Sequence, residues 1–217
     1  PAFYDIDIVG LKRSTQLGIY QIASGKTIDE VEKTDVVVIP LLCGNFKKAV
    51  IENQSYTDWV VKQYNKGCEI VCLCVGSFYL ASTGLLNDKK CAVHWAAKNE
   101  FAELYPQITV IENNIITDES GIYTCGGGYS YLNLILYVFE KHLGREISIL
   151  ASKMFEIDIE RKSQNPFAIF MGQKKHGDET VLRAQEWIEN HPTETYTVEK
   201  ICDKFGVGRR TFERRFK

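Results

Sequence analysis

The chain has 217 residues, of which 45% are hydrophobic and 25% are charged, with a formal net charge of −2. This composition is typical of a folded globular protein, and the length suits one large α/β domain with a small second domain. No apolar stretch approaches the roughly 18 residues that a membrane-spanning helix needs. Residues 1–7 lack the basic-then-apolar pattern of a secretion signal, so we expect a cytoplasmic protein with no membrane partner.

In the first half of the chain, apolar runs predict strands that alternate with helices. Residues 35–42 form a continuous apolar run rich in β-branched side chains, which is typical of a strand covered on both faces. Residues 52–66 carry apolar side chains at helical spacing. The predicted elements are a strand at 4–11, a strand at 35–42, a helix at 52–66, a strand at 69–73 and a helix directly after Cys74.

The second half of the chain continues this alternation. Pro106 ends a predicted helix, and residues 118–121 (DESG) predict a turn between strands. The predicted elements are a strand at 91–95, a helix at 97–105, strands at 108–114 and 115–125, and a long apolar helix at 129–142. Strands separated by helices predict a mostly parallel sheet with helices on both faces, within a domain that spans residues 1–162.

Cys74 follows the strand at 69–73 and runs straight into a helix. Ligands of mostly parallel sheets bind at the carboxyl ends of the strands, where Cys74 is expected to lie. Several enzyme folds expose a nucleophile on such a turn, and the N–H groups of the following helix favour a thiolate. Cys74 is therefore the candidate nucleophile-elbow residue.

The seven cysteines predict thiols that stay reduced. Their number is odd, and most of them lie inside apolar, strand-like runs, which is typical of intracellular proteins. Cys68, Cys72 and Cys74 are close in sequence, but no second ligand pair stands at the spacing of a zinc site. The sequence therefore predicts no metal site and no cofactor.

Residues 163–177 break the pattern, and we interpret them as a linker that packs partly on its neighbours. Residues 178–192 predict an amphipathic helix capped by Asp178, and 197–217 predict two short helices with a turn at 205–207. This spacing is typical of a helix-turn-helix. Its expected apolar seam consists of Ile201, Val207, Phe212 and Phe216.

The second of these short helices is strongly basic. It carries Arg209, Arg210, Arg214, Arg215 and Lys217 against the single acid Glu213. A charge run is often only a solvated helix face. Here, however, the charge is confined to the helix that a helix-turn-helix places in the major groove, where basic side chains neutralise phosphates and reach guanine edges. The sequence therefore favours DNA as a partner.

Two stretches resemble known families. Residues 206–217, GVGRRTFERRFK, closely resemble the first helix-turn-helix of AraC-type regulators. Residues 74–95, CVGSFYLASTGLLNDKKCAVHW, resemble the nucleophile-elbow helix and the following His-Trp pair of the ThiJ/PfpI domain, which is similar to class I glutamine amidotransferases. Together they resemble GlxA-like transcription regulators over nearly the whole chain. The resemblance implies a flavodoxin-like three-layer α/β sandwich followed by an all-α helix-turn-helix segment.

The resemblance also implies that the family's domains extend beyond this sequence. In the family, a first strand and helix precede the part that matches residue 1 onwards. AraC-type modules carry two helix-turn-helix units, so residues 178–217 match only the first half of such a module. Gly208 stands where the family usually has a serine N-cap.

Departures from the family's enzymes decide what we expect of Cys74. Leu41 and Leu42 stand where the enzymes carry a glycine pair that leaves N–H groups free near the nucleophile, and Val75 stands where the peptidase-like branch carries histidine. Catalysis needs a base and an oriented donor as well as a thiol. We therefore expect no enzyme activity, and we place Cys74, Val75, His94 and Leu42 in an effector pocket.

Alternatives remain open for the two central side chains. Cys74 lines an effector pocket, is an inherited packing position, or catalyses a reaction. His94 is either a hydrogen-bonded structural residue or a contact for a ligand near Cys74.

The sequence thus predicts a DNA-binding transcription regulator whose amidotransferase-like domain senses an unknown small-molecule effector or dimerises. The candidate DNA contacts are Arg209, Arg210 and Thr211 for base edges, and Arg214 and Arg215 for phosphates. We expect a homodimer, because such regulators read paired sites. The alternatives are a ThiJ/PfpI-type cysteine enzyme, a hydratase or amidohydrolase that uses Cys74, and a dimerisation scaffold without a ligand.

Overall fold

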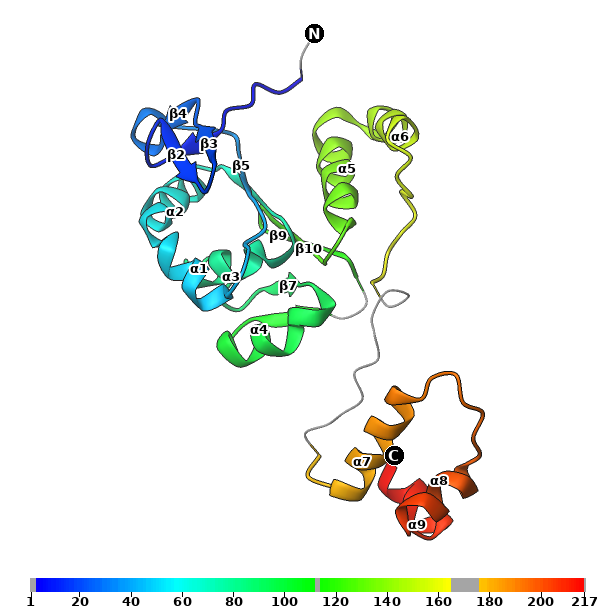
Figure 1. Ribbon diagram of the computed structural model, residues 1–217. Coiled ribbons are helices and arrows are strands. Elements are labelled where there is room, and N and C mark those ends of the chain that lie inside the picture. The colour runs from blue at the N-terminus through cyan, green and yellow to red at the C-terminus, as the bar shows by residue number, and fades with distance from the viewer. Residues whose placement is uncertain (1–2, 112–113, 165–175, 217) are drawn as a thin grey trace. The chain divides into compact units, whose positions relative to one another are not determined.

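The structure is a computed structural model that describes residues 3–111, 114–164 and 176–216 (Figure 1). The chain divides into two compact units, residues 1–168 and residues 169–217. None of the described helices is long and apolar enough to cross a membrane.

A four-stranded sheet forms the centre of the first unit, in the order β5-β6-β10-β9. Its strands are β5 (Val36–Ile39), β6 (Glu69–Cys72), β10 (Ile122–Cys125) and β9 (Ile116–Glu119). The first three are parallel and β9 is antiparallel to β10. Ser120 and Gly121, both with positive φ, form the tight turn between β9 and β10, in the second half of the predicted turn.

A smaller parallel pair lies beside this sheet. It consists of β7 (Lys90–Ala92) and β8 (Thr109–Ile111), joined by α4 (Lys98–Leu104). The Ala92 N–H donates to Thr124 Oγ1 at 2.8 Å, which ties β7 to the end of β10. The predicted α/β class with mostly parallel pairing is confirmed, although the strands form separate hydrogen-bonded sheets.

Helices cover both faces of the central sheet. Successive residues of β6 point to opposite faces, so Ile70 packs with α2 (Thr57–Asn65), α3 (Ser77–Ser82) and α4, and Val71 packs toward α5 (Ser130–Leu143). The predicted helices after Cys74, at 97–105 and at 129–142 are confirmed. The predicted helix at 52–66 is interrupted: α1 (Phe46–Glu52) ends at Asn53, and α2 begins only at Thr57.

The predicted strand at 4–11 is mostly wrong. Only β1 (Val9–Gly10) forms, and it pairs with β4 (Lys26–Thr27), next to an unpredicted hairpin of β2 (Ser14–Leu17) and β3 (Tyr20–Ala23). Residues 4–7 form no strand, and Ile6 is 83% exposed; the Ile8 carbonyl accepts the N–H groups of Gly25 and Lys26 beside β4. Alternating apolar residues form a strand only where a neighbouring strand takes up the backbone hydrogen bonds.

The outer edge of β5 also has no strand paired with it among the described residues. Within the described ranges β5 pairs only with β6, and Val38 is 51% exposed, so the expectation that residues 35–42 are covered on both faces is wrong at this position. A groove of about 730 Å³ lies along β5. Its lining includes Ile6, Val9, Val38 and Leu42.

The second unit consists of α7 (Glu179–Asn190), α8 (Val198–Phe205) and α9 (Arg209–Phe216). Asp178 caps α7 as predicted, because its Oδ1 accepts the Val181 N–H at 3.1 Å. Gly206, with φ 63°, ends α8 in the left-handed conformation that a helix C-terminus favours. The buried core consists of Ala184, Ile201, Cys202 and Phe212, with Val207 packed against it.

Phe216 is 41% exposed, so it is not a core residue as predicted. Of the predicted linker at 163–177, residues 165–175 lie outside the described part of the chain. A further helix of the first unit, α6 (Arg145–Met154), was not predicted.

Candidate functional site

Cys74 lies on a sharp turn at the carboxyl end of β6, as predicted. Its φ is 51°, a left-handed value that non-glycine residues rarely adopt, and a 3-10 turn at Cys74–Gly76 leads into α3. Gly76 is required here because a Cβ atom at this position would lie 2.4 Å from the carbonyl oxygen of Pro40. The turn is therefore held tightly against the end of β5.

The thiol of Cys74 is half-buried and receives backbone hydrogen bonds. The N–H groups of Val75 and Gly128 donate to its sulfur and lower its pKa, whereas burial raises it. Burial is the larger effect, so the pKa of Cys74 lies above its ordinary value. The two N–H groups thus lower the pKa of the thiol, as the sequence predicted, but they do not bring it below the ordinary value for cysteine.

The cysteines near Cys74 are more deeply buried. Burial raises the pKa of Cys91 and that of Cys125 to about 12. The Cys74 N–H donates to the Cys125 sulfur at 3.3 Å, so this amide already has a partner. Among the described residues, no three His, Cys, Asp or Glu side chains gather closely enough to hold a metal ion.

His94 has a structural role at the end of β7. Its Nδ1 accepts the Ala96 N–H at 3.1 Å and caps the 3-10 turn at Trp95–Ala97. Because Nδ1 is an acceptor and burial lowers the pKa of His94, the ring is neutral with its proton on Nε2. The ring lies against Gly127, where a Cβ atom would be 1.7 Å from Cδ2. A contact between His94 and a ligand stays a prediction.

Gln164 joins the same site, although the sequence analysis gave it no role. It is only 5% exposed. Its Oε1 accepts the N–H groups of Gly127 at 2.8 Å and Trp95 at 3.2 Å, and its Nε2 donates to the Val93 carbonyl at 2.9 Å. A single glutamine in an irregular segment carries no periodic signal, so the sequence alone could not have found it.

The structure therefore brings Cys74, His94 and Gln164 to one run of glycines at 126–128. The other two candidates for the effector pocket lie differently. Val75 packs partly buried against the core, and Leu42 lines the groove beside β5.

The basic residues of α9 fall into two groups. Arg209 pairs with Glu199 and with Glu213, and Arg215 makes a double hydrogen bond to the Asp178 carboxylate. These contacts raise the pKa of both arginines. In the described part of the chain, Arg210 and Arg214 have no ion-pair partner; one helical turn apart, they share an exposed face.

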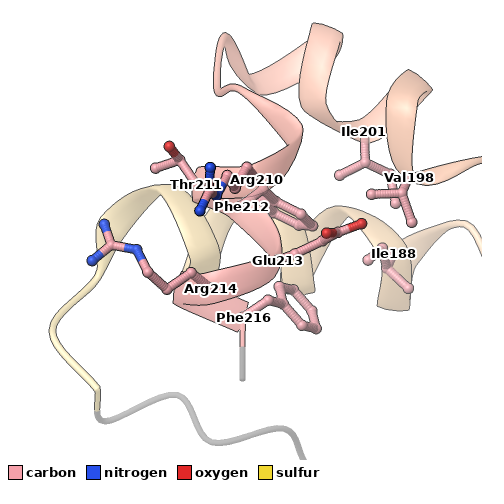
Figure 2. A pocket seen from close by; sticks show the side chains of 9 residues that line it. All are labelled: Ile188, Val198, Ile201, Arg210, Thr211, Phe212, Glu213, Arg214 and Phe216. Atoms are coloured by element: carbon pink, nitrogen blue, oxygen red, sulfur yellow. The ribbon is translucent and has the colours of Figure 1, made fainter.

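The opposite side of α9 is apolar (Figure 2). There Phe212 and Phe216 point toward Ile188 and Val198, whereas Thr211 and Arg214 point away from them. A cavity of about 860 Å³ is lined by these apolar side chains and also by Arg210, Thr211 and Arg214. Glu213, which is held by Arg209, is the acidic residue in its lining.

Comparison with known proteins places the first unit in a family. Residues 4–141 match the DJ-1/PfpI family. The HTH-type transcriptional regulator GbdR of Pseudomonas aeruginosa is 23% identical over 200 residues, which are 90% of this chain and 53% of that protein. The HTH-type transcriptional regulator GlxA of Rhizobium meliloti is 30% identical over 73 residues, 34% of this chain and 22% of that regulator. The chain thus spans about half the length of GbdR.

An enzyme and a solved structure are also similar. The isonitrile hydratase of Pseudomonas putida is 24% identical over 152 residues, which are 69% of this chain and 62% of the enzyme. The crystal structure of a ThiJ/PfpI family protein from Pseudomonas syringae has a TM-score of 0.60 at 17% identity and covers 93% of this chain and 78% of that one. The expected resemblance, a DJ-1/PfpI domain with distant homology to AraC-type regulators, is confirmed. The chain belongs to the DJ-1/PfpI family.

Proposed function

We propose that the chain is part of a cytoplasmic transcription regulator that binds DNA in a sequence-specific manner. In this proposal, α8 and α9 form a helix-turn-helix, and α9 enters the major groove. The observation that carries the proposal is the exposed face of α9, where Arg210, Thr211 and Arg214 lie opposite the buried Phe212. Side chains so placed can reach base edges and phosphates.

The ion pairs of α9 refine the roles of its arginines. Arg210 and Thr211 are the proposed base contacts, and Arg214 is a proposed phosphate contact. Arg209 and Arg215 reach DNA only by leaving Glu199 and Asp178, which hold them in the structure. We therefore assign them a smaller share of the binding free energy.

The experiment uses duplexes selected from a random pool by the 217-residue chain. Arg210→Ala should weaken binding to a selected duplex by roughly 1–3 kcal/mol relative to random DNA, because a bidentate base contact is lost. Lys47→Ala on α1 removes the same charge from the first unit and serves as the control. Equal losses on selected and random DNA would contradict the base contact. Failure to enrich any sequence would contradict the proposed function.

We propose that the DJ-1/PfpI domain serves as the sensor of an unknown small-molecule effector or as the dimerisation domain. The glycine run at 126–128 beside Cys74 and His94 is the proposed effector site. The DNA-binding role also implies a homodimer, since paired half-sites are read by paired domains.

A cysteine enzyme is the second candidate, and two observations favour it. Cys74 has the strained φ of an exposed nucleophile, and an isonitrile hydratase matches 69% of the chain. Against it stand the raised pKa of Cys74 and the role of His94 as a cap. Incubation with isocyanide, amide and α-oxoaldehyde substrates tests the point. Turnover above background that disappears in Cys74→Ser would establish the enzyme.

A further inference from the structure

We propose that a cavity between α5, α6 and the segment after α6 binds a small organic anion, a molecule that carries carboxylate or phosphate groups on a carbon skeleton. The cavity has a volume of about 500 Å³. It is separate from the proposed effector site, because Cys74, His94 and the glycines at 126–128 do not line it. The proposal goes beyond the proposed function and does not depend on it.

The lining of this cavity is strongly basic. Among the described residues, four cationic side chains line it against one carboxylate, that of Glu140. The cations are Lys141 of α5, Arg145 of α6, and Arg161 and Lys162 of the segment that follows α6. Guanidinium groups hold carboxylates and phosphates through paired hydrogen bonds. The lining therefore favours an anion.

Contacts within the chain already engage two of these cations. Arg145 Nη1 donates to Glu140 Oε2 at 2.7 Å, and Lys141 Nζ donates to Asp118 Oδ2 at 2.9 Å. Lys162 is exposed and has no ion-pair partner in the described part of the chain. Lys162 can therefore turn toward a bound anion without breaking an internal ion pair.

The rest of the lining fits a carbon skeleton. Ile115, Leu136 and Ile159 offer apolar contacts, and the side-chain amides of Asn114 and Asn133 can bind polar groups. A volume of about 500 Å³ lies within the range of roughly 300–1,000 Å³ that is usual for sites of small organic ligands. A bare inorganic ion would leave most of this volume unfilled, so we expect the carbon skeleton to be part of the ligand.

Hydrogen bonds fix the walls of the cavity. Asn133 Nδ2 donates to the Asp158 carbonyl at 2.6 Å, which holds the segment after α6 against α5. The Ile115 N–H donates to the Lys162 carbonyl at 3.1 Å, which holds the same segment beside the start of β9. A ligand therefore enters a site that is already formed, and its binding does not have to order these elements first.

The test titrates the 217-residue chain with citrate, glucose 6-phosphate and uncharged glucose in a calorimeter, at roughly 0.1 M salt to screen weak surface contacts. At least one of the two anions should bind saturably with a dissociation constant below about 1 mM, and glucose should not bind. Tighter binding of citrate would identify carboxylates as the preferred groups, and tighter binding of glucose 6-phosphate would identify phosphate. Saturable binding of neither anion would overturn the proposal.

Two substitutions connect the binding to the cavity. Lys162→Gln removes an exposed cation and should weaken binding at least about fivefold. Glu140→Gln removes the carboxylate from the lining, releases Arg145 and should strengthen binding at least about threefold. Lys47→Gln on α1 and Glu100→Gln on α4 remove the same charges outside the cavity and are the matched controls. Equal changes in a variant and its control would show that only net charge matters, which would overturn the proposal.

The basic face of α9 also carries cations, so a second measurement separates the two surfaces. In NMR spectra of the isotope-labelled chain, the anion should shift the side-chain amide of Asn133 and the backbone N–H of Ile116 but not the backbone N–H of Thr211. If Lys162→Gln fails to fold, these spectra of the unsubstituted chain decide. Shifts at Asn133 and Ile116 support the proposal, and shifts confined to α9 would overturn it.

Discussion

Gly127 lies so close to His94 that no side chain fits between them. A Cβ atom on residue 127 would lie 1.7 Å from Cδ2 of the imidazole. The ring cannot turn away freely, because its Nδ1 accepts the Ala96 N–H. The absence of a side chain at position 127 therefore fixes the wall of the candidate site.

This packing predicts that Gly127→Ala destabilises the protein by about 1–3 kcal/mol, the usual cost of overpacking. Denaturant unfolding measures the cost. In the background of His94→Ala the same substitution should cost much less, because the ring that it displaces is absent. Equal costs in both backgrounds would show that the clash is not with His94.

A second prediction concerns the rate at which Cys74 is alkylated. Alkylation requires the thiolate, and burial raises the pKa of Cys74, so its labelling should be slow near neutral pH. The rate should still rise with pH beyond the pH at which an ordinary cysteine levels off. Mass spectrometry of labelled peptides gives the rate at Cys74 beside that at the exposed Cys43. A rate at Cys74 that is fast and independent of pH above 7 would contradict the prediction.

A third prediction concerns the affinity for DNA when the contact between Arg215 and Asp178 is removed. Asp178→Asn keeps a good cap for α7 but removes the carboxylate that holds Arg215. Arg215 then becomes available to phosphates, so random DNA should bind more tightly, with a salt dependence steeper by about one unit in log–log slope. Glu186→Gln removes the same charge from α7 and is the matched control. An identical change in both variants would mean that only net charge matters.

A fourth prediction concerns assembly. The α6 region exposes large apolar side chains: Leu150 is 54% exposed, and Met154 and Phe155 are each 70% exposed. Such a patch is typical of an interaction surface, and the proposed function calls for a homodimer. Met154→Lys should therefore shift the chain from dimer to monomer in sedimentation at tens of micromolar. Ile51→Lys, which changes an equally exposed residue on α1, should leave the dimer intact.

The strands and helices that could be predicted are those whose buried side chains produce a recognisable spacing of apolar residues in the sequence. The run at 69–73 is continuous because Ile70 and Val71 are buried on opposite faces of the sheet, and the helix at 129–142 is long and apolar because it covers one face. The alternation at 4–8 carries the same kind of signal. It failed because a strand also needs a neighbour, which no local pattern reports.

The candidate site likewise has features that the sequence predicts and features that it does not. The turn at Cys74 could be predicted, since a strand that passes into a helix without a break forces a sharp bend at one residue. The pKa of the thiol could not be predicted. It depends on whether the increase caused by burial exceeds the decrease caused by two backbone N–H groups, one of which belongs to the distant Gly128. Gln164 was missed because its partners, including Val93 and Gly127, are distant in sequence.

The open edge of β5 has a practical consequence for the isolated chain. Its run Val36–Ile39 carries no charge, and Pro40 comes only after the strand has ended, so neither of the usual deterrents to further strand pairing is present. Val38, half exposed on this edge, offers an apolar contact to any extended segment that approaches. Aggregation by edge-to-edge pairing, more than thermal unfolding, should limit how concentrated a solution of this chain can become.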